Sequence, residues 1–191
     1  MAINKLGTHT LETPRLILRR FRLDDAQNMF DNYCSDSEVT KYLTWSPHAN
    51  IEVTRMFLAS NIQAYENPST FRWALELKAI GEVIGCIDLV GLHEHDESGV
   101  LGWVLSRKYW GLGLMPEALL AVEKFMFEYV GLHRLEATHH ADNYQSGRVM
   151  QKGHMTCEGR RREAFLDHTG RHVDLVVYSI LATEYRNQKK F

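Results

Sequence analysis

The sequence has few cysteines, no long apolar run and no marked excess of charge of either sign. Cys34, Cys86 and Cys157 are odd in number and far apart, so they indicate neither a disulfide framework nor the Cys-x-x-Cys spacing of a metal site. Free thiols are typical of a reducing compartment. Residues 1–10 contain no apolar segment typical of a secretion signal, and no segment approaches the roughly 20 apolar residues of a membrane span. We therefore expect a cytoplasmic protein with no membrane partner.

The chain has 191 residues, a formal net charge of −2 and a sequence pI of about 6.5. Proteins that bind nucleic acid usually carry a basic face, so this balance argues against a nucleic-acid partner. Hydrophobic residues make up 45% of the sequence, which is enough for a sizeable core. No internal repeat and no linker rich in Pro, Gly or Ser divides the chain. We expect a single domain over residues 1–191.

Hydrophobic periodicity and turn residues predict strands and helices along the whole chain. The strongest helical pattern is Leu114–Tyr129, which Gly131 ends, and Ala79–Gly81 is typical of a hairpin turn. Asp24 is placed to cap the first helix, and the polar segment His93–Gly99 predicts a loop.

The predicted strands are Arg15–Phe21, Phe71–Leu77, Val83–Val90, Val100–Leu105, Leu132–His139, Thr156–Leu166 and His172–Thr183. The predicted helices begin at Asp24, Ile51, Leu114 and Gln145, and the second has Val53, Met56, Phe57 and Ala64 on its apolar side. This order contains a strand meander and one β-α-β unit. It predicts a mixed α/β fold with a sheet of about seven strands flanked by about four helices.

Two glycines precede the strongest predicted helix, within the segment Lys108–Glu117. Gly111 and Gly113 permit a tight turn with exposed N–H groups, and the helix N-terminus behind them suits an anion such as a pyrophosphate. Pro116 fits the first helical turn, where no donor is lost. A Rossmann loop would carry a third glycine and a P-loop a Gly-Lys-Ser/Thr ending, and this segment has neither. On this evidence alone, a glycine turn without a ligand is an equal alternative.

A second polar group of residues opens the next predicted helix, in the segment Asn143–Lys152. Asn143 is placed as the cap of this helix, and Ser146 lies one turn inside it. In isolation both residues are ordinary capping residues.

Taken together, these segments resemble the GNAT superfamily of acetyltransferases, whose cofactor signature is Arg/Gln-x-x-Gly-x-Gly/Ala. Within it, the sequence is most similar to the branch that contains the ribosomal-protein N-terminal acetyltransferases. The resemblance runs nearly end to end. It is carried by Thr13–Leu16, Tyr42–Trp45, Ile80–Gly85, Tyr109–Gly113, Ser146–Met150 and Glu158–Gly159.

The resemblance implies a sheet that is splayed open between the strands at Val100–Leu105 and Leu132–His139, with acetyl-coenzyme A between them. The main chain of Trp103, Val104 and Leu105 would bind the pantetheine like an added strand. The pyrophosphate would lie on the Gly111–Gly113 loop. The residues implied at this phosphate site and on the far wall are Lys108, Gly111, Leu112, Gly113, Leu114, Met115, Asn143 and Ser146.

The sequence departs from the family pattern at three positions. Lys108 stands where the wider family often has Arg or Gln, and its charge should still suit phosphates. Met150 stands where many members carry a tyrosine that protonates the leaving thiolate. His154 replaces a glycine that usually precedes the residue matching Met155, which should alter the turn into the next strand.

Acetyl transfer to an amine requires removal of the proton of an ammonium group and protonation of a thiolate, and it requires no metal. A glutamate of the family corresponds to Val100 here, so that candidate base is absent. We take His139 as the substitute, because histidine titrates near neutral pH, although a structural or exposed histidine is an equal interpretation. Ser146 is the candidate donor to the thiolate, and its alternative role is that of a plain cap. The polar run His93–Glu97 resembles a metal cluster but is better explained as a solvated turn.

The sequence leaves the acceptor amine open. A protein N-terminus, such as that of a ribosomal protein, and a small amine, such as an aminoglycoside, a polyamine or an amino acid, are the two enzymatic possibilities. A non-catalytic module that binds acetyl-coenzyme A is a third, because the glutamate and the tyrosine of the family are missing. The long final strands could also pair two copies into a homodimer.

Overall fold

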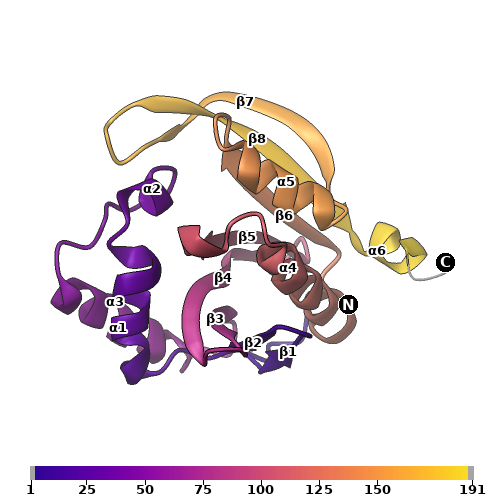
Figure 1. Ribbon diagram of the computed structural model, residues 1–191. Helices are drawn as coiled ribbons and strands as arrows, with labels where there is room; N and C mark the ends of the chain where they lie inside the picture. The colour runs from indigo at the N-terminus through magenta and orange to yellow at the C-terminus, as the bar shows by residue number, and fades with distance from the viewer. Residues whose placement is uncertain (1–2, 189–191) are drawn as a thin grey trace.

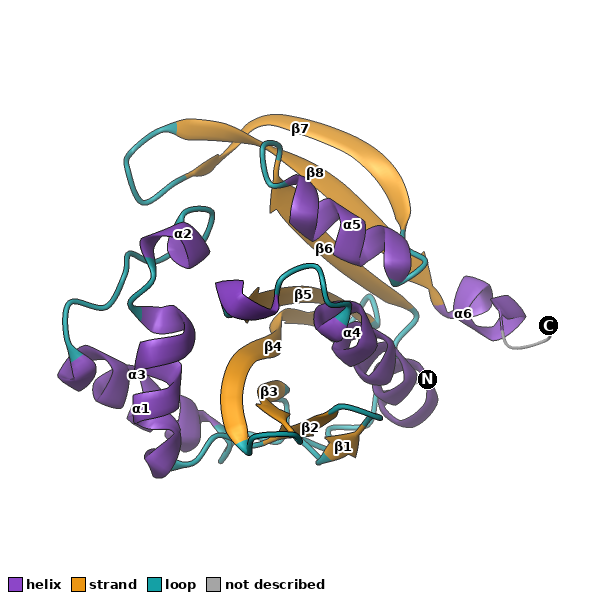
Figure 2. Ribbon diagram, in the orientation of Figure 1, coloured by secondary structure: helices purple, strands orange, loops and turns teal. Residues whose placement is uncertain are grey.

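The computed structural model describes residues 3–188, in which eight strands form one mixed sheet (Figures 1 and 2). The order across the sheet is β1-β2-β3-β4-β5-β6-β8-β7. Within it, β5 and β6 are parallel and the other neighbours are antiparallel. The strands are β1 (Leu11–Glu12), β2 (Leu16–Arg19), β3 (Arg72–Leu77), β4 (Glu82–His93), β5 (Ser98–Leu105), β6 (Arg134–His140), β7 (Thr156–Leu166) and β8 (His172–Leu181).

The helices divide between the two faces of the sheet. They are α1 (Ala26–Met29), α2 (Ser37–Thr40), α3 (Ile51–Ala64), α4 (Leu114–Phe125), α5 (Tyr144–Lys152) and α6 (Ala182–Gln188). Helices α4 and α5 cover one face, here called the α4 face, and α1 and α3 cover the other, here called the α3 face (Figure 1). The mixed α/β fold with a splayed sheet is confirmed. The additional elements are short: strand β1 and helices α2 and α6.

Helix α4 forms where the sequence predicts it. Gly113, in a left-handed conformation, immediately precedes it, and Gly131, also left-handed, ends the five-residue π turn that prolongs it. Its predicted stripe of Leu119, Val122 and Phe125 lies in the core of the α4 face. The predicted hairpin turn between β3 and β4 is likewise present at 78–81, where Gly81 has φ +67°.

Four local predictions are wrong. The side of α3 that is fully buried carries Thr54, Leu58 and Asn61, whereas Met56 is 67% exposed. These polar residues can be buried because the Thr54 hydroxyl bonds His48 Nδ1 and the Asn61 side chain bonds Arg72.

The other three corrections concern element ends. The first helical segment has no side-chain cap from Asp24, and Asp25 Oδ2 instead accepts a hydrogen bond from the N–H of Arg22 at 2.7 Å. The predicted loop His93–Gly99 shrinks to residues 94–97, because the β4–β5 ladder extends to the pair His93–Ser98. The last strand ends at Leu181 rather than Thr183, since the chain turns there into α6. No helix in the part of the chain that the structure describes is long and apolar enough to cross a membrane.

The turn between α5 and β7 contains a left-handed histidine, at the position where the resembling family usually has glycine. His154 has φ +58°, and the N–H groups of His154 and Met155 bond back to the carbonyls of Gln151 and Met150 at 3.1 and 3.0 Å. This is the Schellman arrangement that glycine normally completes. A side chain in this conformation costs on the order of 1 kcal/mol.

We therefore expect His154→Gly to stabilise the fold. Relief of the backbone strain should exceed the entropic cost of glycine and raise the free energy of unfolding by about 1 kcal/mol, a melting shift of roughly 2–4 °C. His154→Ala, which keeps a Cβ in the same conformation, should leave the melting temperature within about a degree. Differential scanning calorimetry would contradict the interpretation if the glycine variant melted below the wild type.

A buried acid lies where α4 meets the end of α5. Glu123 is 1% exposed, and its two carboxylate oxygens have no hydrogen-bond partner among residues 3–188. The contact is tight, since a Cβ at Gly153 would lie 3.0 Å from Glu123 Oε1. Burial raises the pKa of Glu123 to about 8, so the group is mostly neutral in the folded protein at pH 7.

This acid should make stability fall as the pH rises. The pKa of Glu123 is about 8 in the folded protein and 4.5 in the unfolded chain. Protonation of Glu123 therefore contributes its full stabilisation below pH 4.5. That contribution decreases between pH 4.5 and about pH 8 and is lost above it. Glu123→Gln should unfold like the wild type at pH 4.5 and be more stable at pH 8, on the order of 2 kcal/mol. Urea titrations at the two pH values measure this difference. The exposed Glu66→Gln should show no such divergence, and equal pH dependence in all three proteins would refute the assignment.

Candidate cofactor and acyl-transfer site

Strands β5 and β6 pair over a short distance and then part. Their parallel register joins Ser98–Leu101 to Arg134–Ala137. Beyond it, β5 continues to Leu105 in register with β4, while β6 continues to His140 in register with β8. The two halves of the sheet therefore diverge, as Figure 1 shows. We call the place where β5 and β6 part, after Leu101 and Ala137, the splay.

The main chain of Trp103, Val104 and Leu105 lies along the β5 side of the splay. Trp103 is half-buried on the α4 face, while Val104 packs on the α3 face. The Leu105 carbonyl accepts a hydrogen bond from Trp110 Nε1 at 2.8 Å. These strand residues therefore border the splay, which is the geometry that strand-like binding of an extended ligand requires.

Both glycines of the loop before α4 adopt the left-handed conformation, with φ +78° at Gly111 and +76° at Gly113. Such values are strained for any residue with a Cβ, and this explains the glycine at both positions. Leu112 between them is 57% exposed. Lys108 is exposed on the 3-10 turn Arg107–Tyr109, which immediately precedes the glycine loop. Its charge is therefore three residues from Gly111 in the sequence.

The first turn of α4 directs its amide groups toward this loop. Helix geometry leaves the N–H groups of Leu114 and Met115 without intrahelical acceptors, and Pro116 has no N–H to leave unpaired. The side chains of Leu114 and Met115 are buried, so the residues are anchored while their amides stay at the helix end. Together with the positive end of the helix dipole, this is a site suited to phosphate groups.

Arg15, which the sequence did not mark as a site residue, holds the glycine loop through contacts that are distant in sequence. Arg15 Nη1 donates to the Leu112 carbonyl at 2.9 Å, and its Nε donates to Glu117 Oε2 at 2.7 Å. The Arg15 N–H donates to the other oxygen of Glu117. Partial burial raises the pKa of Glu117, but hydrogen bonds from Thr13 and Arg15 outweigh it and hold that pKa below its usual value. The only signal in the sequence was the Thr13–Leu16 segment of the family resemblance.

A groove continues from the loop along α4. Its lining includes Gly113 and Pro116 at the start of α4, Lys124 in the last turn of that helix, Lys152 at the end of α5, and the acidic side chains of Glu12 and Glu117. The groove therefore carries charge of both signs, and the anion-binding features are those of the glycine loop itself.

On the β6 side, Asn143 is the cap of α5, as predicted. Its Oδ1 accepts a hydrogen bond from the Ser146 N–H at 3.3 Å. Both side chains are partly exposed at the first turn of the helix. Met150 of the same helix is fully buried in the core of the α4 face, so this position supplies packing.

His139 lies beneath α5 on the α4 face. The residue is 8% exposed, its Nδ1 lies 2.8 Å from the His140 carbonyl, and its ring packs against Tyr178. A carbonyl can only accept, so Nδ1 carries a proton. Nε2 lies against Gly147, where an added Cβ would approach it to 2.9 Å. The structure therefore brings His139 next to the start of α5 and not to the α3 face.

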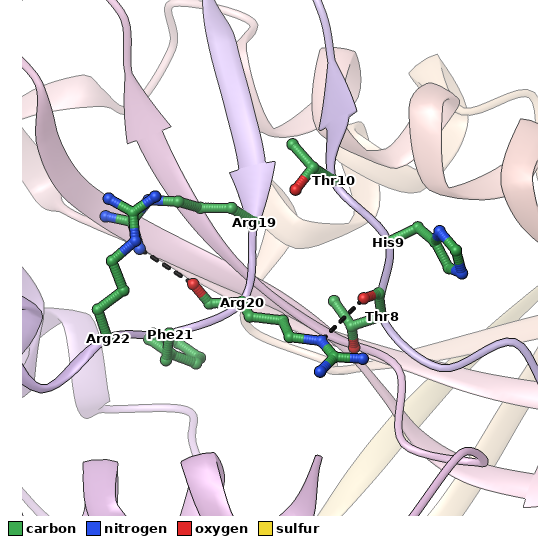
Figure 3. Close-up of a pocket in the computed structure, with 7 residues that line it drawn as sticks. All are labelled: Thr8, His9, Thr10, Arg19, Arg20, Phe21 and Arg22. Carbon is green, nitrogen blue, oxygen red and sulfur yellow. Dashed lines mark hydrogen bonds between the residues drawn. The ribbon is translucent and has the colours of Figure 1, made fainter. Parts of the chain in front are cut away.

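Two other polar regions do not join this site. Figure 3 shows a pocket at the end of β2, in which Arg19 donates to the Arg20 carbonyl and Arg20 to the Thr8 carbonyl. Arg19 is further committed to Asp25 and Glu76. In the turn at 94–97, Glu94 pairs with Lys5 at 2.7 Å. The described residues contain no group of three or more His, Cys, Asp or Glu side chains that could hold a metal ion.

Comparison with known proteins agrees with this geometry. The family model "Acetyltransferase (GNAT) domain" matches residues 15–156. An "Uncharacterized N-acetyltransferase p20" of Bacillus licheniformis is 30% identical over 177 residues, covering 92% of this chain and 98% of its own. The "[Ribosomal protein uS5]-alanine N-acetyltransferase" of Escherichia coli is 25% identical, with 82% of each chain covered.

A solved structure leads to the same family. The crystal structure of an acetyltransferase (GNAT family) from Bacillus anthracis superposes with a TM-score of 0.82 at 30% identity, over 92% of this chain and 100% of that one. With the family model matching most of its length and a 30% identical relative covered nearly end to end, the chain belongs to the GNAT family of acetyltransferases and is an N-acetyltransferase that uses acetyl-coenzyme A.

Proposed function

We propose that this enzyme transfers the acetyl group directly to a primary amine while both substrates are bound, and that the amine is the N-terminal α-amino group of a protein. The observation that carries the direct route is the splay, which opens between the glycine loop on one side and the start of α5 on the other. Two substrates that meet there need positioning and proton transfer, with no covalent intermediate on the enzyme. The single domain over residues 1–191 is part of the proposal, supported by the one continuous sheet.

The residues of the splay fit acetyl-coenzyme A, which supplies an activated thioester to the reaction. The left-handed glycines and the free amides at the start of α4 suit the pyrophosphate, so we assign Gly111, Leu112, Gly113, Leu114 and Met115 to it. The charge of Lys108 adds to this site. The main chain of residues 103–105 is assigned to the pantetheine, and Asn143 and Ser146 to the opposite wall.

We assign Ser146 and His139 to the sulfur side of the reaction. Both belong to the part of the site at the start of α5, where Ser146 is partly exposed and His139 Nε2 lies against Gly147. The Ser146 hydroxyl is suited to donate a hydrogen bond to the departing thiolate, because Met150 offers no hydroxyl. His139, which the sequence suggested as the base for the amine, is proposed here to exchange protons on the sulfur side instead, because it lies beneath α5 on the α4 face.

The acceptor is proposed from relatives alone. The E. coli relative named above is, by its name, an alanine N-acetyltransferase of ribosomal protein uS5, and this supports a protein amino group, here proposed to be the N-terminus, as the acceptor. Incubation with acetyl-coenzyme A and a pool containing N-terminal alanine and serine peptides, spermidine and an aminoglycoside, followed by mass spectrometry, tests it. Acetylated spermidine or aminoglycoside would assign a small amine, and no release of free thiol would assign a binding module.

A cytoplasmic location and a homodimer complete the proposal. Cys34, Cys86 and Cys157 are unpaired in the structure, as suits a reducing compartment. Strand β7 lies at the edge of the sheet with nearly all its residues exposed, so it offers a surface for a second copy. Sedimentation equilibrium measures the oligomeric state.

The glycine loop is open to a direct test. Gly113→Val should abolish the expected micromolar binding of acetyl-coenzyme A, because a β-branched residue is strained at φ +76° and obstructs the approach to the amides. Gly131→Val is the matched control, since Gly131 has φ +85° at the other end of the same helical segment. It should cost similar stability and keep the affinity. Calorimetry that shows unchanged binding to a folded Gly113→Val protein would exclude this site.

The sulfur-side assignment predicts a loss of turnover without a loss of binding. Ser146→Ala and His139→Ala should each lower kcat by roughly 10- to 100-fold at pH 7, because each removes a group that assists proton transfer. The Kd for acetyl-coenzyme A should change less than threefold, since ground-state binding and transition-state assistance are separable. Stopped-flow release of free thiol measures kcat. Two variants with wild-type kcat would limit these residues to capping and packing.

A further inference from the structure

The α3 face carries a buried carboxylate at the level of the splay. Asp88 of β4 is in register with Gly102 of β5, and Gly102 is the first β5 residue beyond the last β5–β6 pair. Gly102 contributes no side chain at this level. The Asp88 side chain is 13% exposed as a whole, and its Oδ1 is buried.

One oxygen of this carboxylate is held and the other is not. Asp88 Oδ2 lies 2.8 Å from Arg72 Nε, and Arg72 also donates to the Asn61 side chain of α3. Asp88 Oδ1 is buried without a hydrogen-bond partner among residues 3–188, as is the nearby Tyr33 hydroxyl. Buried polar atoms are nearly always bonded in folded proteins, so unpaired ones beside a substrate site indicate a missing polar ligand.

The surroundings leave Asp88 anionic at neutral pH. Its ionisable neighbours are Arg72 on β3, Cys86 on its own strand, and Tyr33 and Tyr65 from the helical layer. Burial raises the pKa values of this thiol and of both phenols, so they stay neutral. Burial also raises the pKa of Asp88, to about 6, against the opposing effect of Arg72. Above pH 6 the group is therefore a carboxylate, and a stronger base than an ordinary one.

The facing strand presents polar side chains on the same side. Thr138 and His140 alternate with His139 along β6, so they lie on the α3 face across the splay from Asp88. The His140 ring packs 4.9 Å from the ring of Tyr42, which follows α2. His140 Nδ1 accepts the Asp142 N–H at 3.1 Å and lies 3.8 Å from the Asp142 carboxylate, so this edge of the ring is engaged with its own turn.

We propose that Asp88 binds the ammonium group of the acceptor and takes its proton. This inference rests on the proposed function and places the acceptor on the α3 face, opposite the sulfur-side residues. The ammonium gives one proton to Asp88 Oδ1, which releases it to solvent, and the lone pair of the neutral nitrogen then forms the C–N bond to the acyl carbon. The C–S bond breaks and its electron pair leaves on sulfur. The nitrogen loses its second proton to solvent through the same carboxylate, and the thiolate takes up one proton from water, directly or through the Ser146 hydroxyl, which is reprotonated by that water.

Asp88→Asn is the first test, because it removes the charge and the basicity at constant shape. Using an amine that the wild type acetylates from the peptide and polyamine pool, kcat/KM at pH 7 should fall at least 100-fold. The acid limb of the pH–rate profile near pH 6 should disappear, while the affinity for acetyl-coenzyme A stays within threefold. Asp24→Asn, which changes an exposed carboxylate to the same amide, should behave as the wild type.

Arg72→Gln is the second test, and it does not depend on the stability of the first variant. Without the opposing cation the pKa of Asp88 rises further, so the acid limb should move to higher pH. A purely structural ion pair would leave the position of that limb unchanged. A folded Asp88→Asn protein with wild-type kcat/KM, or an unshifted limb in Arg72→Gln, would overturn the inference alone. A wild type that acetylates no amine of the pool would overturn it together with the proposed function.

Discussion

The structure depends on one parallel pair in an otherwise antiparallel sheet. Because β5 and β6 run in the same direction, the chain between them must cross over a face of the sheet, and α4 makes that crossing. The pair extends only to Leu101 and Ala137, after which each strand stays with its other neighbour. The crossing places the glycine loop and the N-terminus of α4 at the end where the strands part. The splay and the proposed anion site therefore both follow from the parallel pairing of β5 and β6 and the crossover through α4.

Two left-handed glycines and a set of long-range contacts fix the conformation of the proposed anion site before any ligand binds. Two left-handed glycines expose the amides, and Arg15 fixes the loop through the Leu112 carbonyl and the Glu117 carboxylate. Because these contacts tie β2 to the start of α4, the loop is part of the packed structure and its position costs little on binding. The proposed phosphate site is therefore formed before binding and is built largely from main chain.

The residues proposed to act on the sulfur and on the amine lie on opposite faces of the sheet. His139 and Ser146 lie with α5 on the α4 face, and Asp88 lies with α1 and α3 on the other. A thioester held between the strands would have its sulfur near one set of groups and the attacking amine near the other. This separation lets a thiolate be protonated and an ammonium be deprotonated without the two groups exchanging their proton with each other.

The sequence by itself determined the local features: the hairpin turn at 78–81, helix α4 with its flanking glycines, the Asn143 cap, and the positions of most strands. These features depend on periodicity, turn chemistry and caps, which act over a few residues. The family resemblance added the splay and the cofactor. The tertiary structure alone decided that Arg15 fixes Leu112, that His139 faces α5, and that Asp88 stands beside Gly102. Such contacts depend on strand register, because a shift of one residue turns a side chain to the opposite face of the sheet. Bulges such as the one between Leu75 and Glu76 change the register, and the pattern of residues does not reveal them.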